Sequence, residues 1–180
     1  MLRITLPEIE MWDERKQEFV YAKEQTLQLE HSLVSLQKWE SKWNKPFLHA
    51  TDITYEQTID YVRCMTLTQN VPPETYYRLT DSHINEIKEY IQAPMTATTF
   101  GEDPTAKRNR EIVTAEIIYY WMTAAQIPPE YRKWHLNSLL TLIRVCGIKN
   151  SPPKKGSKKD TISQYAALNA ARKAKLKSKG

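Results

Sequence analysis

The sequence predicts an α+β protein that is mainly α-helical, with a small N-terminal antiparallel sheet packed by about five helices and a basic C-terminal helix. Three observations lead to this class. Apolar and polar residues alternate near the N-terminus, apolar residues recur every three or four positions through the middle of the chain, and Lys and Arg crowd the C-terminal segment. A period of two is typical of half-buried strands, and a period of three to four is typical of amphipathic helices.

The strand signals lie in the N-terminal part of the chain. Alternation is clearest over Leu2–Leu6 and Leu27–Glu30. A further β-prone run, Glu18–Tyr21, follows a polar cluster that begins at Asp13. We expect these runs to form a small antiparallel sheet or meander. We also expect the helices that follow to cover its edges, because exposed edges promote aggregation.

Capping signals indicate where the first two helices begin. Ser32 is the expected N-cap of a helix that ends before Pro46 and carries four apolar residues at helical spacing: Leu33, Leu36, Trp39 and Trp43. Thr54 and Gln57 have the spacing of a capping box, in which each side chain bonds the backbone N–H of the other residue. We therefore predict helices after Ser32 and after Thr54.

Proline and polar residues mark the elements that come next. Pro72-Pro73-Glu74 predicts a short helical turn. Asp81 or Ser82 is expected to cap a helix that ends at Pro94 and carries Ile84, Ile87 and Ile91. The stretch Ala93–Arg108 has no sustained period, so we predict a long surface loop there.

The segment Ile112–Met122 is apolar in nearly every helical direction, which predicts a central buried helix with Asn109 as its N-cap. Glu116 is the unusual acid within it. Because a buried carboxylate needs a partner, we expect an ion pair with Arg132 or Arg144, or a hydrogen bond from a tyrosine hydroxyl. An exposed polar stripe is the alternative.

The last helix of the body is predicted to start at Pro128-Pro129-Glu130, with Gly147 in the left-handed position just after its end. Beyond this point the composition changes. Residues 150–180 hold nine Lys or Arg against one acid, Asp160, for a net charge of +8, whereas residues 1–149 carry −3 with His neutral. We therefore predict a globular α+β domain over residues 1–149, and a basic linker and C-terminal helix over residues 150–180.

Asp160 is expected to cap this C-terminal helix, Thr161–Lys177, which is rich in Ala and ends in Lys and Arg. Its apolar stripe is thin and consists of Ile162, Tyr165 and Leu168. We expect the helix to fray or project until it meets a partner.

No motif indicates catalysis, a metal or a cofactor. The four histidines are scattered, and neither Cys64 nor Cys146 has a partner at metal-binding spacing. The chain lacks a glycine-rich phosphate loop. A thiol–imidazole pair with His135 would need a neighbouring group that lowers the pKa of the thiol, and the local sequence offers none. We predict that the protein is not an enzyme and uses no cofactor.

The sequence also predicts a cytoplasmic location and no membrane span. The longest charge-free apolar stretch, Ile117–Pro129, is shorter than the roughly 20 residues that a membrane span needs. The N-terminus lacks the apolar core of a secretory signal. Both thiols are expected to be free and reduced.

Two groups of residues are candidates for partner binding. The first lies in weakly periodic surroundings or in the predicted loop: Trp12, Tyr76, Tyr77, Met95 and Phe100. The second is basic and could attract an acidic surface of protein or nucleic acid: Lys154, Lys155, Lys158, Lys159, Arg172, Lys173, Lys175 and Lys177. The alternative for this basic group is a solvated terminus. The tryptophans at helical spacing are instead predicted to belong to the core: Trp39, Trp43, Trp121 and Trp134.

Four segments are similar to a group of phage and prophage proteins from Gram-positive bacteria: Ser32–Leu48 (SLVSLQKWESKWNKPFL), Glu89–Phe100 (EYIQAPMTATTF), Glu111–Met122 (EIVTAEIIYYWM) and Lys133–Lys155 (KWHLNSLLTLIRVCGIKNSPPKK). Over most of its length the chain resembles the tail assembly chaperones of long-tailed phages.

The resemblance implies a non-enzymatic protein of the host cell cytoplasm that binds the tape-measure protein and tail-tube subunits during tail morphogenesis. It implies no catalytic residues. Two alternatives stay open: a structural virion protein of the tail or head-to-tail joint, and a nucleic-acid-binding protein that acts through the basic C-terminus. A homo-oligomer is compatible with each of them.

Overall fold

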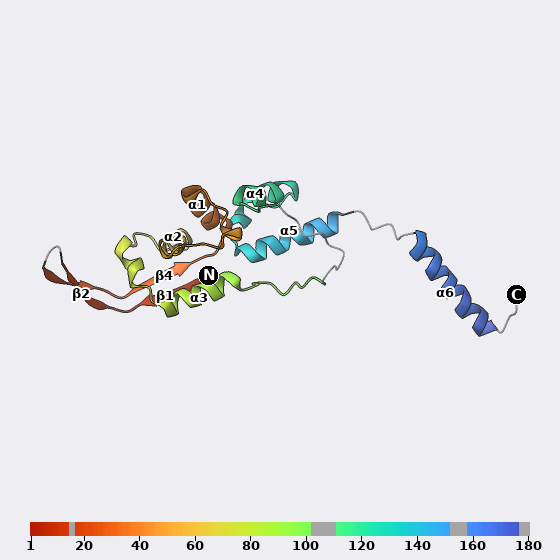
Figure 1. The fold of residues 1–180 in the computed structure, drawn as a ribbon, viewed down its shortest axis with the longest axis horizontal. Helices are drawn as coiled ribbons and strands as arrows, with labels where there is room; N and C mark the ends of the chain where they lie inside the picture. The colour runs from red at the N-terminus through yellow and green to blue at the C-terminus, as the bar shows by residue number, and fades with distance from the viewer. Residues whose placement is uncertain (15–16, 102–110, 152–157, 177–180) are drawn as a thin grey trace. The chain divides into compact units, whose positions relative to one another are not determined.

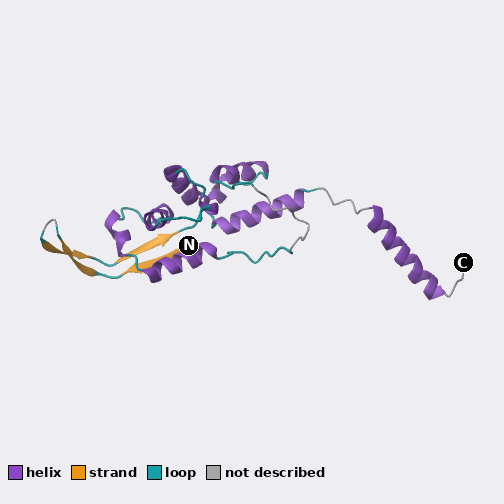
Figure 2. Cartoon of the chain, viewed as in Figure 1, coloured by secondary structure: helices purple, strands orange, loops and turns teal. Residues whose placement is uncertain are grey.

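Strands occupy the N-terminal part of the chain and helices the remainder, as Figures 1 and 2 show for the computed structural model. The structure describes residues 1–14, 17–101, 111–151 and 158–176. Its elements are β1 (Leu2–Leu6), β2 (Ile9–Asp13), β3 (Glu18–Ala22), β4 (Gln25–Leu29), α1 (Leu33–Trp43), η1 (Phe47–His49), α2 (Tyr55–Met65), η2 (Pro73–Arg78), α3 (Asp81–Gln92), α4 (Ala115–Ala124), η3 (Pro129–Lys133), α5 (Leu136–Asn150) and α6 (Lys158–Leu176). The predicted class, mainly helical α+β with a small N-terminal antiparallel sheet, is confirmed.

The chain divides into two units, Met1–Gly147 and Ile148–Gly180. The predicted boundary, after residue 149, lies close to this division. Gly147 does not take the predicted left-handed position, because α5 continues through it to Asn150 and no described glycine has a positive φ. A Cβ at Gly147 would meet nothing within 4 Å, so neither packing nor backbone conformation requires a glycine there.

The four strands form one antiparallel ribbon with an interruption. Leu2 pairs with Leu29 in β1–β4, and Ile9 pairs with Ala22 in β2–β3, so both halves keep the same register. Pro7 lies at the interruption, where it has no N–H to donate to the ladder. The polar cluster that begins at Asp13 is where β2 ends and the chain turns back into β3. Sequence analysis did not identify β2.

The first core lies between β1–β4 and three helices, α1, α2 and α3. One face of the strands supplies four buried side chains: Ile4, Leu6, Leu27 and Leu29. Trp39 of α1 is fully buried among them, and its indole Nε1 donates to the carbonyl oxygen of Gln57 at 2.9 Å. This bond satisfies the polar atom of the largest core side chain, as burial requires.

A second core lies on the other side of α1, which contributes Leu33 and Leu36. α4 contributes Ala115, Ile118 and Met122, and α5 contributes Leu136 and Leu139. Glu40 of α1 links two segments that border this core through hydrogen bonds. Its buried carboxylate accepts from the backbone N–H of Phe47 at 2.9 Å and from that of Ala115, at the start of α4, at 2.7 Å.

The predicted central helix is wrong in two respects. α4 begins only at Ala115, with Thr114 as its N-cap, and it is buried along one face. Ile112 is 56% exposed and Tyr120 is 69% exposed. Apolar side chains on all sides of a helix do not reveal which side its neighbours cover, and here the second core covers one. The predicted cap, Asn109, lies outside the described residues.

The expectation that Glu116 is buried beside a partner is also wrong. Its side chain is exposed, so it needs no buried partner and the alternative of an exposed stripe holds. It stands in the first turn of α4, where a negative charge interacts favourably with the helix dipole.

The predicted helix starts are mostly confirmed. Ser32 and Thr54 cap α1 and α2, and each makes a reciprocal capping box, with Ser35 and Gln57 respectively. α3 is capped by Thr80 instead of Asp81 or Ser82. Pro72 and Pro128 each precede a short 3-10 helix. The predicted start of the last helix of the body at Pro128 is wrong, because α5 begins separately at Leu136.

Candidate partner-binding surfaces

An apolar groove lies between α2 and α3 at the edge of the first core. Its cavity volume is about 320 Å³. Side chains of the two helices and of the segment after α1 form its apolar walls: Phe47, Ile53, Tyr61, Val62, Ile84, Ile87 and Ile91. Its polar lining consists of Thr51, Thr58, Lys88 and Gln92. A groove of this composition suits the apolar face of an amphipathic segment.

The groove forms because both helices are amphipathic and each begins with a side-chain N-cap. On α3 the isoleucines at positions 84, 87 and 91 follow helical spacing and fall on one face. The N-caps of both helices accept from the backbone N–H three residues on, at Thr54 and at Thr80. The two apolar faces therefore meet over the first core, and the groove remains between them.

The β2–β3 hairpin carries large apolar side chains that nothing in the described unit covers. Trp12 and Phe19 face each other across the strands with ring centroids 5.0 Å apart, and they are 52% and 66% exposed. Tyr21 is 56% exposed, and its hydroxyl donates to the Glu8 carboxylate, which raises the pKa of Tyr21. Exposed aromatic groups of this kind are typical of interaction sites.

Arg78 forms hydrogen bonds to both sides of the base of this hairpin. Its guanidinium donates to the carbonyl oxygen of Lys23 at 3.3 Å and to that of Pro7. Pro7 lies between β1 and β2, and Lys23 lies between β3 and β4. The two carbonyls therefore belong to opposite sides of the ribbon, at the point where its strand pairing is interrupted. A single cation therefore holds both strands at the base of the arm.

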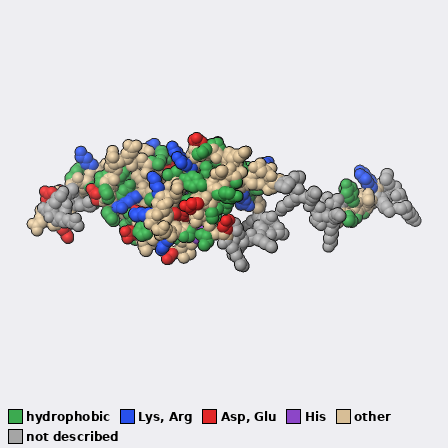
Figure 3. All heavy atoms as spheres, turned by 90° about the horizontal axis from the view of Figure 1, so that it is seen from above, with side chains coloured by type: hydrophobic (Ala, Val, Ile, Leu, Met, Phe, Trp, Pro, Cys, Tyr) green, Lys and Arg blue, Asp and Glu red, His purple; other side chains and the backbone are tan. Residues whose placement is uncertain are grey.

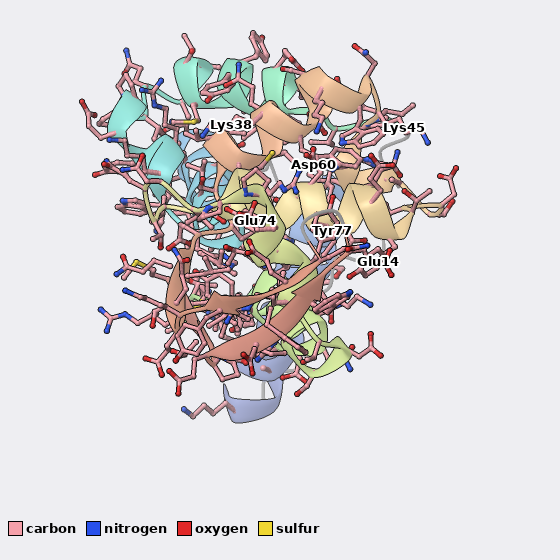
Figure 4. All side chains as sticks on the ribbon, turned by 90° about the vertical axis from the view of Figure 1, so that its left-hand side faces the viewer. Glu14, Lys38, Lys45, Asp60, Glu74 and Tyr77 are labelled. Carbon is pink, nitrogen blue, oxygen red and sulfur yellow. The ribbon has the colours of Figure 1, made fainter. Side chains whose placement is uncertain are left out.

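The two neighbouring tyrosines of η2 have opposite environments. Tyr77, labelled with Glu74 in Figure 4, is 67% exposed, as a docking residue would be. Tyr76 is only 6% exposed, so the prediction that it is an exposed docking residue is wrong. Successive side chains of a 3-10 helix point about 120° apart, so one can enter the core while the next stays outside. The Arg63 guanidinium lies 5.2 Å and 5.7 Å from the two ring centroids.

The candidates in the predicted loop also differ. Residues 93–101 contain no helix or strand, and the rest of the loop lies outside the described residues. Met95 is 45% exposed and its carbonyl accepts from the Ser138 hydroxyl at 2.6 Å. Phe100 is half-buried, with the Arg144 guanidinium 4.0 Å from its ring centroid, and is thus already engaged within the chain.

Only part of the predicted tryptophan core is found. Trp39 is fully buried, and Trp43 and Trp121 are half-buried. Trp134 is 45% exposed and stacks on Tyr131 with ring centroids 4.1 Å apart, so its assignment to the core is wrong. Trp134 follows η3 and precedes α5, and it therefore belongs to neither helix face. On the face of Met1–Gly147 seen in Figure 3, apolar side chains lie between acidic and basic ones.

The basic candidates are described in part. Arg172 and Lys175 are exposed on α6. The backbone of Lys158, Lys159 and Lys173 belongs to the same helix. α6 begins at Lys158, before the predicted cap Asp160. Its apolar stripe is open to solvent, with exposed fractions of 68% for Ile162, 64% for Tyr165 and 52% for Leu168. Three further candidates lie outside the described residues: Lys154, Lys155 and Lys177.

A buried polar cluster, which sequence analysis missed, joins the end of β4 to the start of α5. His31 and His135 stack edge to face with ring centroids 5.2 Å apart. His31 Nδ1 shares a 2.7 Å hydrogen bond with the Tyr61 hydroxyl. Asn137 N–H donates to His135 Nδ1, so the proton of a neutral ring sits on Nε2, which faces the Tyr90 carbonyl oxygen at 3.1 Å.

Burial decides the protonation of this cluster. It lowers the pKa of His31 to about 3, with the nearby His135 adding to the effect. It also lowers the pKa of His135. Burial raises the pKa of Tyr61. All three groups are therefore uncharged near neutral pH, which suits a structural junction between the two cores. The backbone confirms the junction, since Leu136 N–H donates to the His31 carbonyl oxygen at 2.7 Å.

The Cys64 thiol and the acidic and imidazole groups offer no reactive arrangement among the described residues. Burial raises the pKa of the half-buried Cys64 thiol to about 11, which keeps it in the less reactive protonated form. Within the ranges that the structure describes, no group of three or more His, Cys, Asp or Glu is placed to hold a metal ion. None of the helices described is long and apolar enough to span a bilayer.

No family model, curated protein or solved structure matches the chain. The groove could not be found from sequence, because its walls come from three separate segments. The aromatic hairpin was signalled in part, by Trp12 and by the β-prone run that contains Phe19.

Proposed function

We propose that the protein is a non-enzymatic tail assembly chaperone of a long-tailed phage, which binds the tape-measure protein and tail-tube subunits during tail morphogenesis. The groove between α2 and α3 is the observation that carries this proposal. Its isoleucine wall and polar rim match an amphipathic helix, and the long apolar helices of a tape-measure protein are what such a chaperone would keep from aggregating. The resemblance of four segments to such chaperones supports the same role.

The groove suggests how such a helix would be held. Its apolar side chains at positions i, i+3 and i+7 would enter between Ile87 and Ile91 on one side and Val62 on the other. Lys88 lines the groove and would favour an acidic residue on the flank of the bound helix. Burial of apolar area supplies affinity, at roughly 25 cal/mol per Å² before the cost of association is subtracted.

Co-expression with the tape-measure protein of the same phage tests the proposal. Thr51→Trp places an indole over the groove from an exposed position, and Thr99→Trp makes the same change at an exposed loop position outside it. We expect soluble tape-measure protein with the wild type and with Thr99→Trp, and aggregation with Thr51→Trp. A tape-measure protein that is equally soluble without this chain contradicts the proposal.

Two observations favour alternative functions, and a separate experiment tests each of them. Exposed Arg172 and Lys175 near Tyr165 suit nucleic acid, and binding of this kind would weaken steeply with salt. The uncovered aromatic pair Trp12 and Phe19 would suit permanent burial in a virion. Detection of this protein in stoichiometric amount by mass spectrometry of purified particles would favour the structural role over a transient chaperone.

A further inference from the structure

The β2–β3 hairpin has the properties of an interaction arm. It continues the ribbon beyond the first core and makes few contacts with other elements, as Figure 1 shows. A two-stranded hairpin without a covering layer is marginally stable on its own. Here the Trp12–Phe19 pair and the Arg78 bonds at the base support it. A supported arm with exposed aromatic side chains offers a preformed apolar surface.

The arm is also acidic. The segment 8–24 contains six acids, Glu8, Glu10, Asp13, Glu14, Glu18 and Glu24, against three bases, Arg15, Lys16 and Lys23, so its net charge is −3. Among these, Glu8, Glu10 and Glu14 are exposed, and Glu8 lies on the face of Tyr21, whose hydroxyl donates to it. The register places Glu10 opposite Tyr21 and next to the Trp12–Phe19 pair on the same face. Carboxylates therefore border the exposed aromatic side chains.

The second unit has the complementary chemistry. α6 exposes a narrow stripe of Ile162, Tyr165 and Leu168, and its C-terminal half exposes Arg172 and Lys175. The segment 150–180 has a net charge of +8. An apolar stripe that ends in cations matches an aromatic surface bordered by carboxylates, because both are apolar at the centre and their charges are opposite in sign.

We propose that α6 of one copy binds the β2–β3 hairpin of a second copy. The apolar stripe packs on Trp12 and Phe19, and Arg172 and Lys175 face Glu8 and Glu10. The contact joins two different surfaces, so it is heterologous and builds chains or rings of subunits. Nucleic acid is the alternative occupant of α6, and the experiment below distinguishes the two.

Charge exchange between full-length variants tests the proposal. Arg172→Glu/Lys175→Glu reverses the sign of the two exposed cations of α6, and Glu8→Lys/Glu10→Lys changes the net charge of segment 8–24 from −3 to +1. Sedimentation velocity at increasing protein concentration should show self-association of the wild type that weakens with salt. Each variant alone should bind itself about tenfold more weakly, because like charges then meet. An equimolar mixture should restore association, because the two carboxylates introduced in α6 of one variant meet the two lysines introduced in the hairpin of the other.

Glu86→Lys/Glu89→Lys is the matched control, since it makes the same charge change at exposed positions of α3. It should associate like the wild type. Trp12→Ala is a second disruption that leaves charge unaltered and should also weaken association. Far-UV circular dichroism of each variant verifies that the helices are intact.

Several results would overturn the proposal. These are a wild type that stays monomeric at all concentrations, charge variants that associate as strongly as the wild type, and a mixture that is no more associated than its components. Monomeric protein that binds a DNA oligonucleotide through Arg172 and Lys175 would assign α6 to nucleic acid instead.

Discussion

Lowering the pH from 7 to 5 is expected to destabilise the protein through the buried imidazole of His31. The ring is 1% exposed, bonds the Tyr61 hydroxyl and stacks against His135. Protonation would place a cation between two cores, where no carboxylate bonds the ring. In the unfolded chain the same imidazole is free to accept a proton.

The magnitude follows from the pKa of His31, which burial lowers from 6.5 to about 3. Between these values the unfolded state binds more protons than the folded state. The stabilisation is therefore complete above about pH 6.5 and is lost as the pH falls toward 3. From pH 7 to pH 5 the loss from His31 is about 2 kcal/mol. The lowered pKa of His135 adds to it. The pKa of Glu40, raised mainly by burial, opposes it as the pH approaches 4.5.

Urea unfolding at pH 7 and pH 5, followed by the fluorescence of tryptophans that include the buried Trp39, measures this loss. His31→Gln keeps a polar side chain beside Tyr61 but cannot titrate. Its free energy of unfolding should fall by about 2 kcal/mol less than that of the wild type over the same interval. His49→Gln, which removes an exposed imidazole, is the matched control and should follow the wild type.

Equal losses for His31→Gln and the wild type would refute the reasoning, because the pH dependence would then come from other groups. If His31→Gln does not fold, His135→Gln offers the same comparison from the other side of the ring contact.

Four further substitutions test the packing and the hairpin. Arg78→Ala should remove the bonds to Lys23 and Pro7 and speed hydrogen exchange of the hairpin amides about fivefold, for a loss of roughly 1 kcal/mol; unchanged exchange would contradict the fastening role. Trp39→Ala should lower the free energy of unfolding by about 3–5 kcal/mol in urea, whereas Trp12→Ala should cost at most about 1.5 kcal/mol; equal costs would contradict the burial difference. Thr54→Ala removes the N-cap of α2 and should cost about 1 kcal/mol by thermal unfolding, and a melting curve identical to that of the wild type would count against the cap.

Local features of the fold were predictable from sequence because they depend on residues a few positions apart. The caps at Ser32 and Thr54 bond residues three positions away, and Pro73 and Pro129 begin helical turns with their own fixed φ angles. The strands β1 and β4 followed from simple alternation. For the candidate surfaces, sequence patterns indicated Trp12 and Tyr77, which are exposed; whether a partner binds them remains a prediction.

The remaining features depend on which distant segment covers a given face. Glu40 caps α4 through Ala115, which is 75 residues away, and a local pattern contains no information about that contact. The same holds for Tyr76, which entered the core, for Trp134, which stayed outside, and for the groove, whose walls meet only after α2 and α3 pack. The sequence by itself determined the starts of α1 and α2 and which residues need cover. Only the tertiary structure decided which of them receive it, because burial depends on neighbours brought together by folding.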